Sequence, residues 1–125
     1  ESSNKLSKLR DEISRCSIKN IEIIHASGEI DIPLENDFLD VILIYDVYHL
    51  LSEQQRERLI KEAARLLKNG GILSYHATHL SRYGVNLEEV HEKMKKVDLT
   101  HLTCHEKLMF HWQWIEEGTV INYYK

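Results

Sequence analysis

The segment spanning residues 40–78 constrains the fold most, because it predicts a strand, a helix and a second strand in direct succession. Residues 41–44 are continuously apolar, which is typical of a strand inside a sheet that helices cover on both sides. Ser52 and Gln55 have the spacing of a capping box and predict where the helix begins. Because a helical crossover joins them, this strand and the one predicted at residues 72–75 should be parallel neighbours.

The first part of the chain shows helical and then strand-like patterning. An apolar residue at every third or fourth position from Leu6 to Cys16 predicts a helix that begins after Ser3 or Asn4 and ends by Asn20. Residues 21–25 are rich in β-branched side chains and predict a short strand. Residues 69–71 (Asn-Gly-Gly) predict a left-handed stop for the middle helix.

The last part of the chain predicts one more helix and a hairpin. Asn86 and Glu89 suggest a capped helix start. Residues 100–112 and 119–124 read as strands, and the Glu-Glu-Gly at 116–118 reads as the turn of an antiparallel hairpin. The alternation of strands and helices predicts an α/β fold with helices on both faces of the sheet.

Length and composition limit the possible classes of protein. The 125 residues predict one domain or part of one, with no boundary inside residues 1–125, and 42% hydrophobic residues allow a core. The 16 basic residues against 20 acidic ones argue against a nucleic-acid surface. No apolar run approaches the roughly 20 residues of a membrane span. Cys16 and Cys104 form no CxxC motif, so we expect both to be reduced and buried in a cytoplasmic protein.

Unusual polar and aromatic residues gather where the predicted strands end. In open α/β sheets, ligands bind beyond the carboxyl ends of the strands. The segments at these ends are residues 25–29, 45–51, 76–85 and 111–115. They predict the edge at which a ligand binds, without indicating a reaction.

Two segments resemble the middle of class I S-adenosylmethionine (SAM)-dependent methyltransferases. Residues 32–51 (IPLENDFLDVILIYDVYHLL) are similar to the family's Leu-Pro…Phe-Asp-Val-Val…Leu-His-His-Leu segment. Residues 58–73 (RLIKEAARLLKNGGIL) are similar to its Glu-x-x-Arg-x-Leu-Lys-Pro-Gly-Gly segment, with Asn69 in place of Pro. Residues 20–29 are similar to its third strand and adenine contact, with Ser27 in place of Asp. The resemblance implies a Rossmann-like sheet, closed by the hairpin, and SAM as the cofactor.

The resemblance also implies which residues contact the cofactor. The residue after the family's second strand binds the ribose, those after the third strand contact adenine, and those after the fourth lie beside the methionine part of SAM. The corresponding residues are Glu1 for the ribose, Ser27, Gly28 and Glu29 for adenine, and Tyr45, Asp46 and Val47 for methionine.

Catalysis by such enzymes relies mainly on placing the acceptor in line with the methyl sulfonium, and a base is needed only if the acceptor loses a proton. The candidate catalytic residues are Asp46, His76 and His79. The acidic balance argues against a nucleic-acid acceptor, and we expect a small-molecule acceptor that the sequence does not identify. His101 and His105 would lie about 13 Å apart on a strand, too far to share an ion, and we predict no metal site.

The 125 residues contain no Gly-x-Gly-x-Gly turn, which the family places after its first strand. We therefore expect an incomplete methyltransferase sheet: the carboxy-terminal portion of a longer domain, inactive in isolation. Without the family's first two strands, the apolar strand 41–44 would have an unpaired edge. Such an edge predicts self-association, or pairing of residues 41–44 with residues 21–24.

Two other functions stay open. Half of a nicotinamide-dependent dehydrogenase shares the α/β pattern, but no Tyr in the sequence has a Lys four positions later, as short-chain types require. A methyltransferase-like interaction domain that has lost cofactor binding is the second alternative, and Ser27 favours it.

Overall fold

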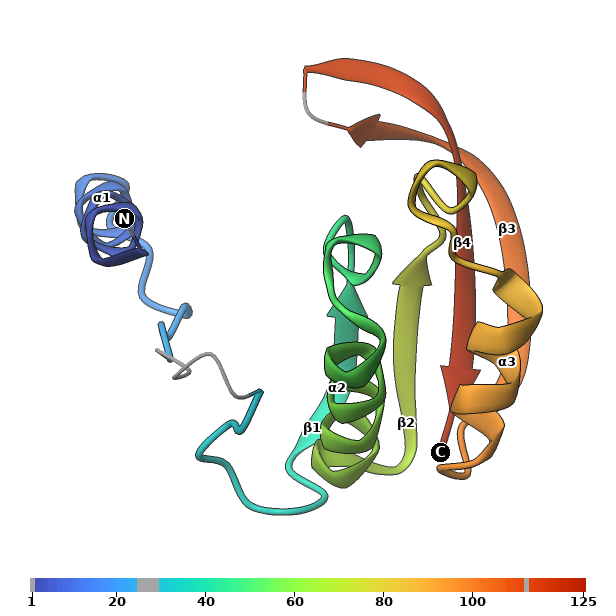
Figure 1. Ribbon diagram of the computed structural model, residues 1–125. Helices are drawn as coiled ribbons and strands as arrows, with labels where there is room; N and C mark the ends of the chain where they lie inside the picture. Colours follow the sequence, from blue (N-terminus) through green and yellow to red (C-terminus); the bar gives the residue numbers. More distant parts are fainter. Residues whose placement is uncertain (1, 25–29, 112) are drawn as a thin grey trace.

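The protein is built on an open four-stranded sheet, shown by a computed structural model that describes residues 2–24, 30–111 and 113–125 (Figure 1). The strands are β1 (Leu39–Ile44), β2 (Leu67–His76), β3 (Thr100–His111) and β4 (Trp114–Tyr124). Their spatial order is β1-β2-β4-β3. β1 and β2 are parallel, as the strand–helix–strand pattern predicts, and β4 runs antiparallel to both β2 and β3.

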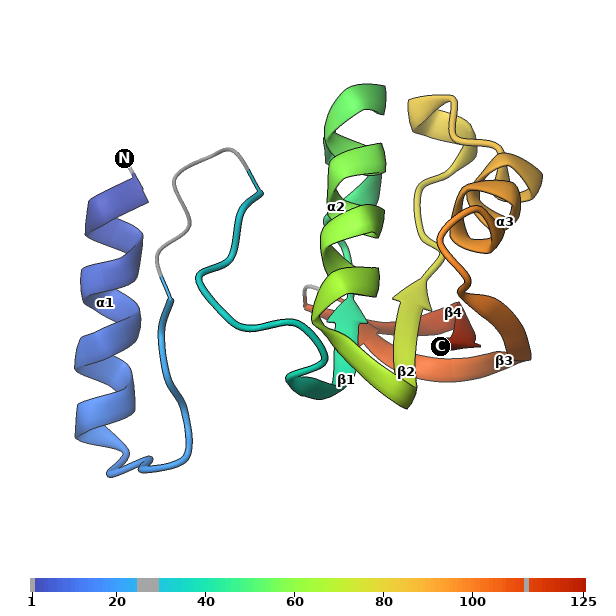
Figure 2. The same cartoon turned by 90° about the horizontal axis from the view of Figure 1, so that it is seen from below.

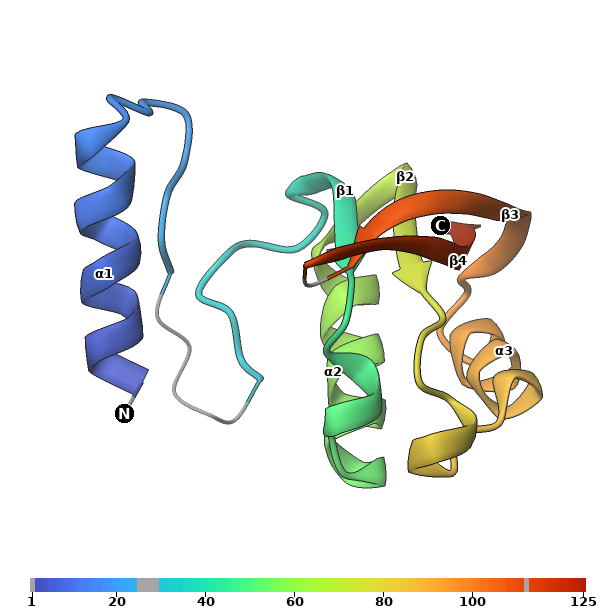
Figure 3. The same cartoon turned by 90° about the horizontal axis from the view of Figure 1, so that it is seen from above.

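Two of the helices cover one face of this sheet. α2 (Glu53–Leu66) and α3 (Leu87–Lys95) lie on the same side of the strands, whereas α1 (Ser2–Arg15) stands apart from the sheet (Figures 2 and 3). The α/β class is thus confirmed, but in the described residues the helices cover only one face. None of the helices in these ranges is long and apolar enough to cross a membrane.

The uncovered face explains the unusual exposure of β1. Side chains of a strand alternate between the two faces of a sheet. Ile44 points to the helices and is buried, whereas Val41 and Leu43 point away and are 54% and 65% exposed. β1 therefore has the sequence of a strand inside a sheet, apolar on both faces. Among the described residues, however, it lies at the edge of the sheet and pairs with β2 alone.

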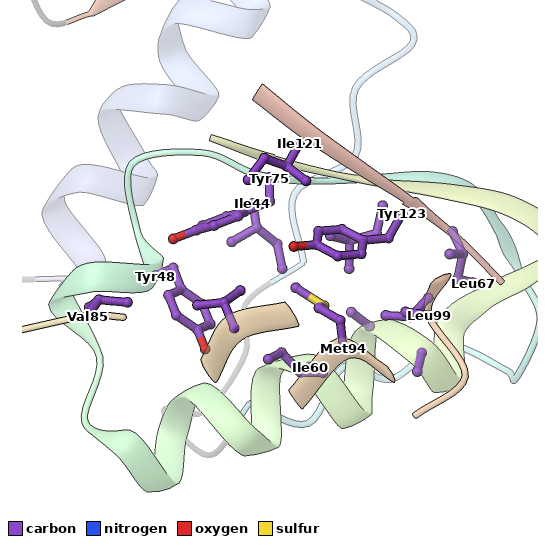
Figure 4. Close-up of a cluster of buried hydrophobic side chains, with 14 residues drawn as sticks. Ile44, Tyr48, Ile60, Leu67, Tyr75, Val85, Met94, Leu99, Ile121 and Tyr123 are labelled. Carbon is purple, nitrogen blue, oxygen red and sulfur yellow. The ribbon is translucent and has the colours of Figure 1, made fainter. Parts of the chain in front are cut away.

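The core lies between the sheet and helices α2 and α3 (Figure 4). Each strand of the sheet centre contributes alternate residues, and each helix contributes one face, as expected of amphipathic elements. Its most deeply buried members include Ile60, Leu67, Leu73, Tyr75, Met94, Ile121 and Tyr123. Burial raises the pKa of Tyr48, which packs edge-on against Tyr75, to about 12.

Helix α2 begins as the sequence predicts. The side chain of Ser52 accepts a hydrogen bond from the Gln55 amide, and the Gln55 side chain accepts one from the Ser52 amide. The helix ends earlier than predicted, at Leu66, because the chain becomes extended at Leu67 to join the sheet. Gly70 does have a left-handed φ of +79° but lies within β2, where its amide donates to the Lys125 carbonyl.

The strand predicted at residues 21–25 is not formed in the described part of that segment, residues 21–24. Within residues 2–24, 30–111 and 113–125, the β1 ladder runs to β2 alone, so the predicted pairing of residues 21–24 with β1 is also wrong. A strand requires a partner for its backbone hydrogen bonds, and β-branched side chains alone do not supply one.

The hairpin turn comes earlier in the chain than the predicted turn at residues 116–118. Residues 116–118 are paired within β4, and the chain reverses between His111 and Trp114, which are themselves paired. Gly118 is needed as a small residue in that strand, because a Cβ there would lie 2.5 Å from the Met109 sulfur and 2.8 Å from His76 Nε2.

The two cysteines are free, but both are exposed rather than buried as predicted. Cys16 follows helix α1, which stands apart from the core, and Cys104 lies on β3. Neither position is covered by another described element, so their small apolar side chains do not contribute to the core.

Candidate functional site

Side chains from three strand ends converge at one edge of the sheet. β1 and β2 point the same way, and the far end of the β3–β4 hairpin lies beyond the carboxyl end of β2 (Figure 1). Four histidines surround Asp46 here, and we call this group the histidine cluster. Its members are His49, His76, His79 and His111.

Asp46 lies at the centre of the cluster, directly after β1. Its backbone is left-handed, with φ +55°, a conformation that Asp tolerates better than most residues. Its Oδ1 atom is 3.2 Å from His111 Nε2, 3.9 Å from His49 Nε2 and 4.0 Å from His79 Nε2. One carboxylate oxygen thus faces three imidazoles that come from different parts of the chain.

His111 lies between two carboxylates at the end of β3. Its Nδ1 atom contacts the Glu116 carboxylate, and its Nε2 atom faces Asp46. The Glu116 hydrogen bond, and then Asp46, raise the pKa of His111. The arrangement fixes the orientation of the ring and concentrates two negative charges beside it.

The pKa values of His49 and His76 are shifted in the opposite direction from that of His111. Burial lowers the pKa of both imidazoles, and a neighbouring histidine adds to the effect: His79 for His49, and His111 for His76. Lowering the pKa favours the neutral ring, which offers a lone pair at neutral pH. The cluster therefore combines imidazoles that can accept a proton with one that is stabilised as a cation.

Of the residues predicted to contact the cofactor, Tyr45, Asp46 and Val47 lie together at this edge. The Tyr45 hydroxyl shares a hydrogen bond of 3.0 Å with Ser74 Oγ, and its ring lies 5.7 Å from that of His76. Val47 is exposed and precedes the short 3-10 helix Tyr48–Leu50. The other predicted contacts, Glu1, Ser27, Gly28 and Glu29, lie outside the described residues.

The predicted catalytic residues Asp46, His76 and His79 all belong to the histidine cluster. A cleft of about 310 Å³ opens beside them, lined by His79, Arg82, His111, Trp114 and Glu116. Four of its five lining residues have polar or charged side chains, but its surface is divided about evenly between polar and apolar atoms, so it suits a small molecule with both kinds of group.

Sequence reasoning did not single out His111 and Glu116. Both belong to the hairpin, more than 60 residues along the chain from Asp46. The position of His111 at a predicted strand end was the available signal. The contact with Asp46 depends on how far the hairpin reaches past β2, which the sequence pattern did not indicate.

Solved structures with a similar fold are methyltransferases. A SAM-dependent methyltransferase from Aquifex aeolicus matches with a TM-score of 0.69 and 16% identity, over 90% of this chain and 59% of that one. The N-methyltransferase NodS of Bradyrhizobium japonicum, in complex with S-adenosylhomocysteine, matches with a TM-score of 0.66 and 18% identity, over 90% and 58%. A SAM-dependent methyltransferase from Methanosarcina mazei matches at 0.60 and 15%, over 78% and 64%.

This chain thus spans about 60% of the length of these three solved structures. No curated protein matches it. A family model described as a methyltransferase domain matches residues 2–75, which include β1, α2 and most of β2. The strand order, the polar edge after β1 and this match agree, and the chain belongs to the methyltransferase domain family.

Proposed function

We propose that the protein takes part in SAM-dependent transfer of a methyl group to a small-molecule acceptor bound at the histidine cluster. The observation that supports this proposal best is the position of Tyr45, Asp46 and Val47. They follow β1 at the edge where ligands bind in open α/β sheets, beside a cleft of about 310 Å³.

The residues present at this edge fit part of the cofactor. SAM supplies a methyl group on a positively charged sulfur, and the Asp46 carboxylate offers a complementary charge. Tyr45 and Val47 are exposed and can contact the methionine portion. This leaves the cleft beside His79 and His111 for the acceptor.

A hydroxyl or neutral amine acceptor has a proton to release when its lone pair attacks the methyl carbon and the carbon–sulfur bond breaks, leaving S-adenosylhomocysteine. His76 is the group best suited to take that proton, since burial favours its neutral form. Its ring is buried and lies 5.7 Å from that of His111, which lines the cleft, so a proton could reach it from there. For an acceptor that carries no such proton, positioning alone suffices.

The glycine-rich turn absent from the 125 residues would supply backbone amides to the cofactor. We therefore infer that useful SAM affinity requires a longer form. The test is calorimetric titration of S-adenosylhomocysteine into this chain and into a form that adds a strand and a Gly-x-Gly-x-Gly turn ahead of Glu1. We expect binding by the longer form alone.

Asp46→Asn in the longer form should weaken binding of SAM itself by about 10-fold or more, because it removes a negative charge that faces the positively charged sulfur. Binding of S-adenosylhomocysteine, whose sulfur is uncharged, should change less. Asp40→Asn is the matched control. Asp40 lies on β1, the strand that Asp46 follows, and its exposed side chain pairs with Lys68. Binding by neither form would instead support an interaction domain that has lost the cofactor. Equal effects of the two substitutions would exclude the role assigned to Asp46.

We also propose that the isolated chain self-associates through the edge of β1 that no described residue pairs with, near Val41 and Leu43, whose exposed side chains a second copy would help to cover. Light scattering should then give a mass above 14.7 kDa at micromolar concentration. Leu43→Lys should restore the monomer, because a charge on an edge strand opposes pairing. A strict monomer for the unchanged chain would contradict the proposal.

A further inference from the structure

Three potential metal ligands meet within the histidine cluster. The ligand atoms of Asp46, His79 and His111 all lie within 4.8 Å of one another. They come from the loops after β1 and β2 and from the end of β3. The prediction of no metal site considered histidines close in sequence, whereas these residues are brought together by the fold.

The distances are close to those of a coordination sphere. Bonds of about 2.0–2.2 Å to a tetrahedral zinc ion place ligand atoms about 3.3–3.6 Å apart. His111 Nε2 is 3.2 Å and His79 Nε2 is 4.0 Å from Asp46 Oδ1. The His79 side chain is about one-third exposed, so a small ring rotation can close the remaining gap.

A carboxylate behind one histidine supports the same assignment independently. Histidines that bind a metal usually donate their other ring N–H to a carboxylate or carbonyl, which fixes the tautomer. The Nδ1 atom of His111 contacts Glu116 in this way, and Nε2 is thereby directed toward Asp46. His49 packs edge-on against His79, with ring centroids 5.0 Å apart, and restricts the second imidazole.

From this geometry we propose that Asp46, His79 and His111 form a binding site for a divalent zinc-type cation, with Glu116 as the positioning residue. Two imidazoles and one carboxylate suit Zn²⁺, whereas Mg²⁺ and Ca²⁺ prefer oxygen ligands alone. Three protein ligands leave a coordination position open.

The open position would face the cleft, because His79, His111 and Glu116 also line it. A hydroxyl, thiol or amine could coordinate there, and the ion would lower the pKa of the bound group. This last step, unlike the metal site itself, rests on the proposed function. If both hold, the acceptor carries an oxygen, sulfur or nitrogen atom that binds the metal ion.

The test uses the tag-free 125-residue chain with both exposed cysteines changed to serine, stripped of metal and titrated with Co²⁺. We expect one equivalent to bind with the visible absorption of a four- or five-coordinate site, and Zn²⁺ to displace it. Asp46→Asn, His79→Gln and His111→Asn should each abolish the signal. Glu116→Gln should weaken binding about 10- to 100-fold, as removal of such partners does elsewhere.

The matched control is His105→Gln, which removes an exposed histidine from the same strand as His111 and should change nothing. Circular dichroism checks that each variant is folded. X-ray absorption of the Zn²⁺-loaded unchanged chain, which depends on no variant, should show two imidazoles. Failure to bind one equivalent, or equal binding by all variants, would overturn the site and leave His111 as an ion-paired residue. Because neither cofactor nor acceptor is present, this result is independent of methyl transfer.

Discussion

Leu73→Ala should destabilise the protein by about 2–5 kcal/mol, the range for buried large-to-small substitutions. Leu73 is 0% exposed on β2, the strand between β1 and β4, where its Cα partners are Ile42 and Tyr123. Truncation removes buried methyl groups and leaves a cavity, because β2 is held between β1 and β4 and the surrounding side chains can move only in part to fill the space. Urea unfolding followed by circular dichroism measures the effect.

Leu108→Ala makes the same chemical change where it should cost little. Leu108 lies on the outer part of the hairpin and is 74% exposed, so we expect a change within about 0.5 kcal/mol. The comparison separates core packing from any general effect of a leucine-to-alanine change. Similar losses at both positions would mean that the hairpin is buried against another surface, or that β2 is not the centre of the core.

Arg65→Ala should cost about 2–3 kcal/mol, because Arg65 joins helix α2 to the loop before β1. Its guanidinium donates to the carbonyls of Ile32 and Leu34 and forms two hydrogen bonds with Glu62. The Glu62 side chain is only 11% exposed, so the substitution would leave a nearly buried carboxylate without its cationic partner. The Arg65 side chain is 31% exposed, and screening by water limits the loss of stability. Urea unfolding measures the loss, and faster hydrogen exchange at the Ile32 amide, which donates to Glu62, would show the loop released.

Two variants calibrate this result. Arg65→Lys keeps the charge but cannot reproduce the forked hydrogen bonds, so it should recover only part of the stability. Arg58→Ala removes an exposed arginine from the same helix and should change stability by less than about 0.5 kcal/mol. An equal loss at both arginines would refute the special role of Arg65.

The effect of Arg65→Ala should also depend on pH. The hydrogen bond from Arg65 lowers the pKa of Glu62 below its ordinary value of 4.5. A group with a lowered pKa in the folded state contributes stability above its unfolded pKa and loses it as the pH falls through the folded value. The destabilisation should therefore be full at pH 7 and shrink below about pH 4.5, as Glu62 becomes protonated.

The comparison of sequence and structure shows where local patterns are sufficient. The capping box at Ser52 and the parallel pairing of β1 with β2 follow from short-range rules and are confirmed. The strand predicted at residues 21–25 fails over residues 21–24, since a strand depends on a partner that local sequence does not specify. The hairpin turn is misplaced because Glu-Glu-Gly has turn composition, whereas long-range pairing holds it within β4.

The candidate site divides in the same way. The sequence by itself determined the α/β class and the edge that carries Asp46, His76 and His79, because the carboxyl ends of parallel strands must lie together. Only the tertiary structure decided that His111 and Glu116 join Asp46, since that contact depends on the length and curvature of the hairpin. The physical reason is that hydrophobic periodicity encodes which face of an element is buried, whereas contacts between distant loops depend on packing across the whole sheet.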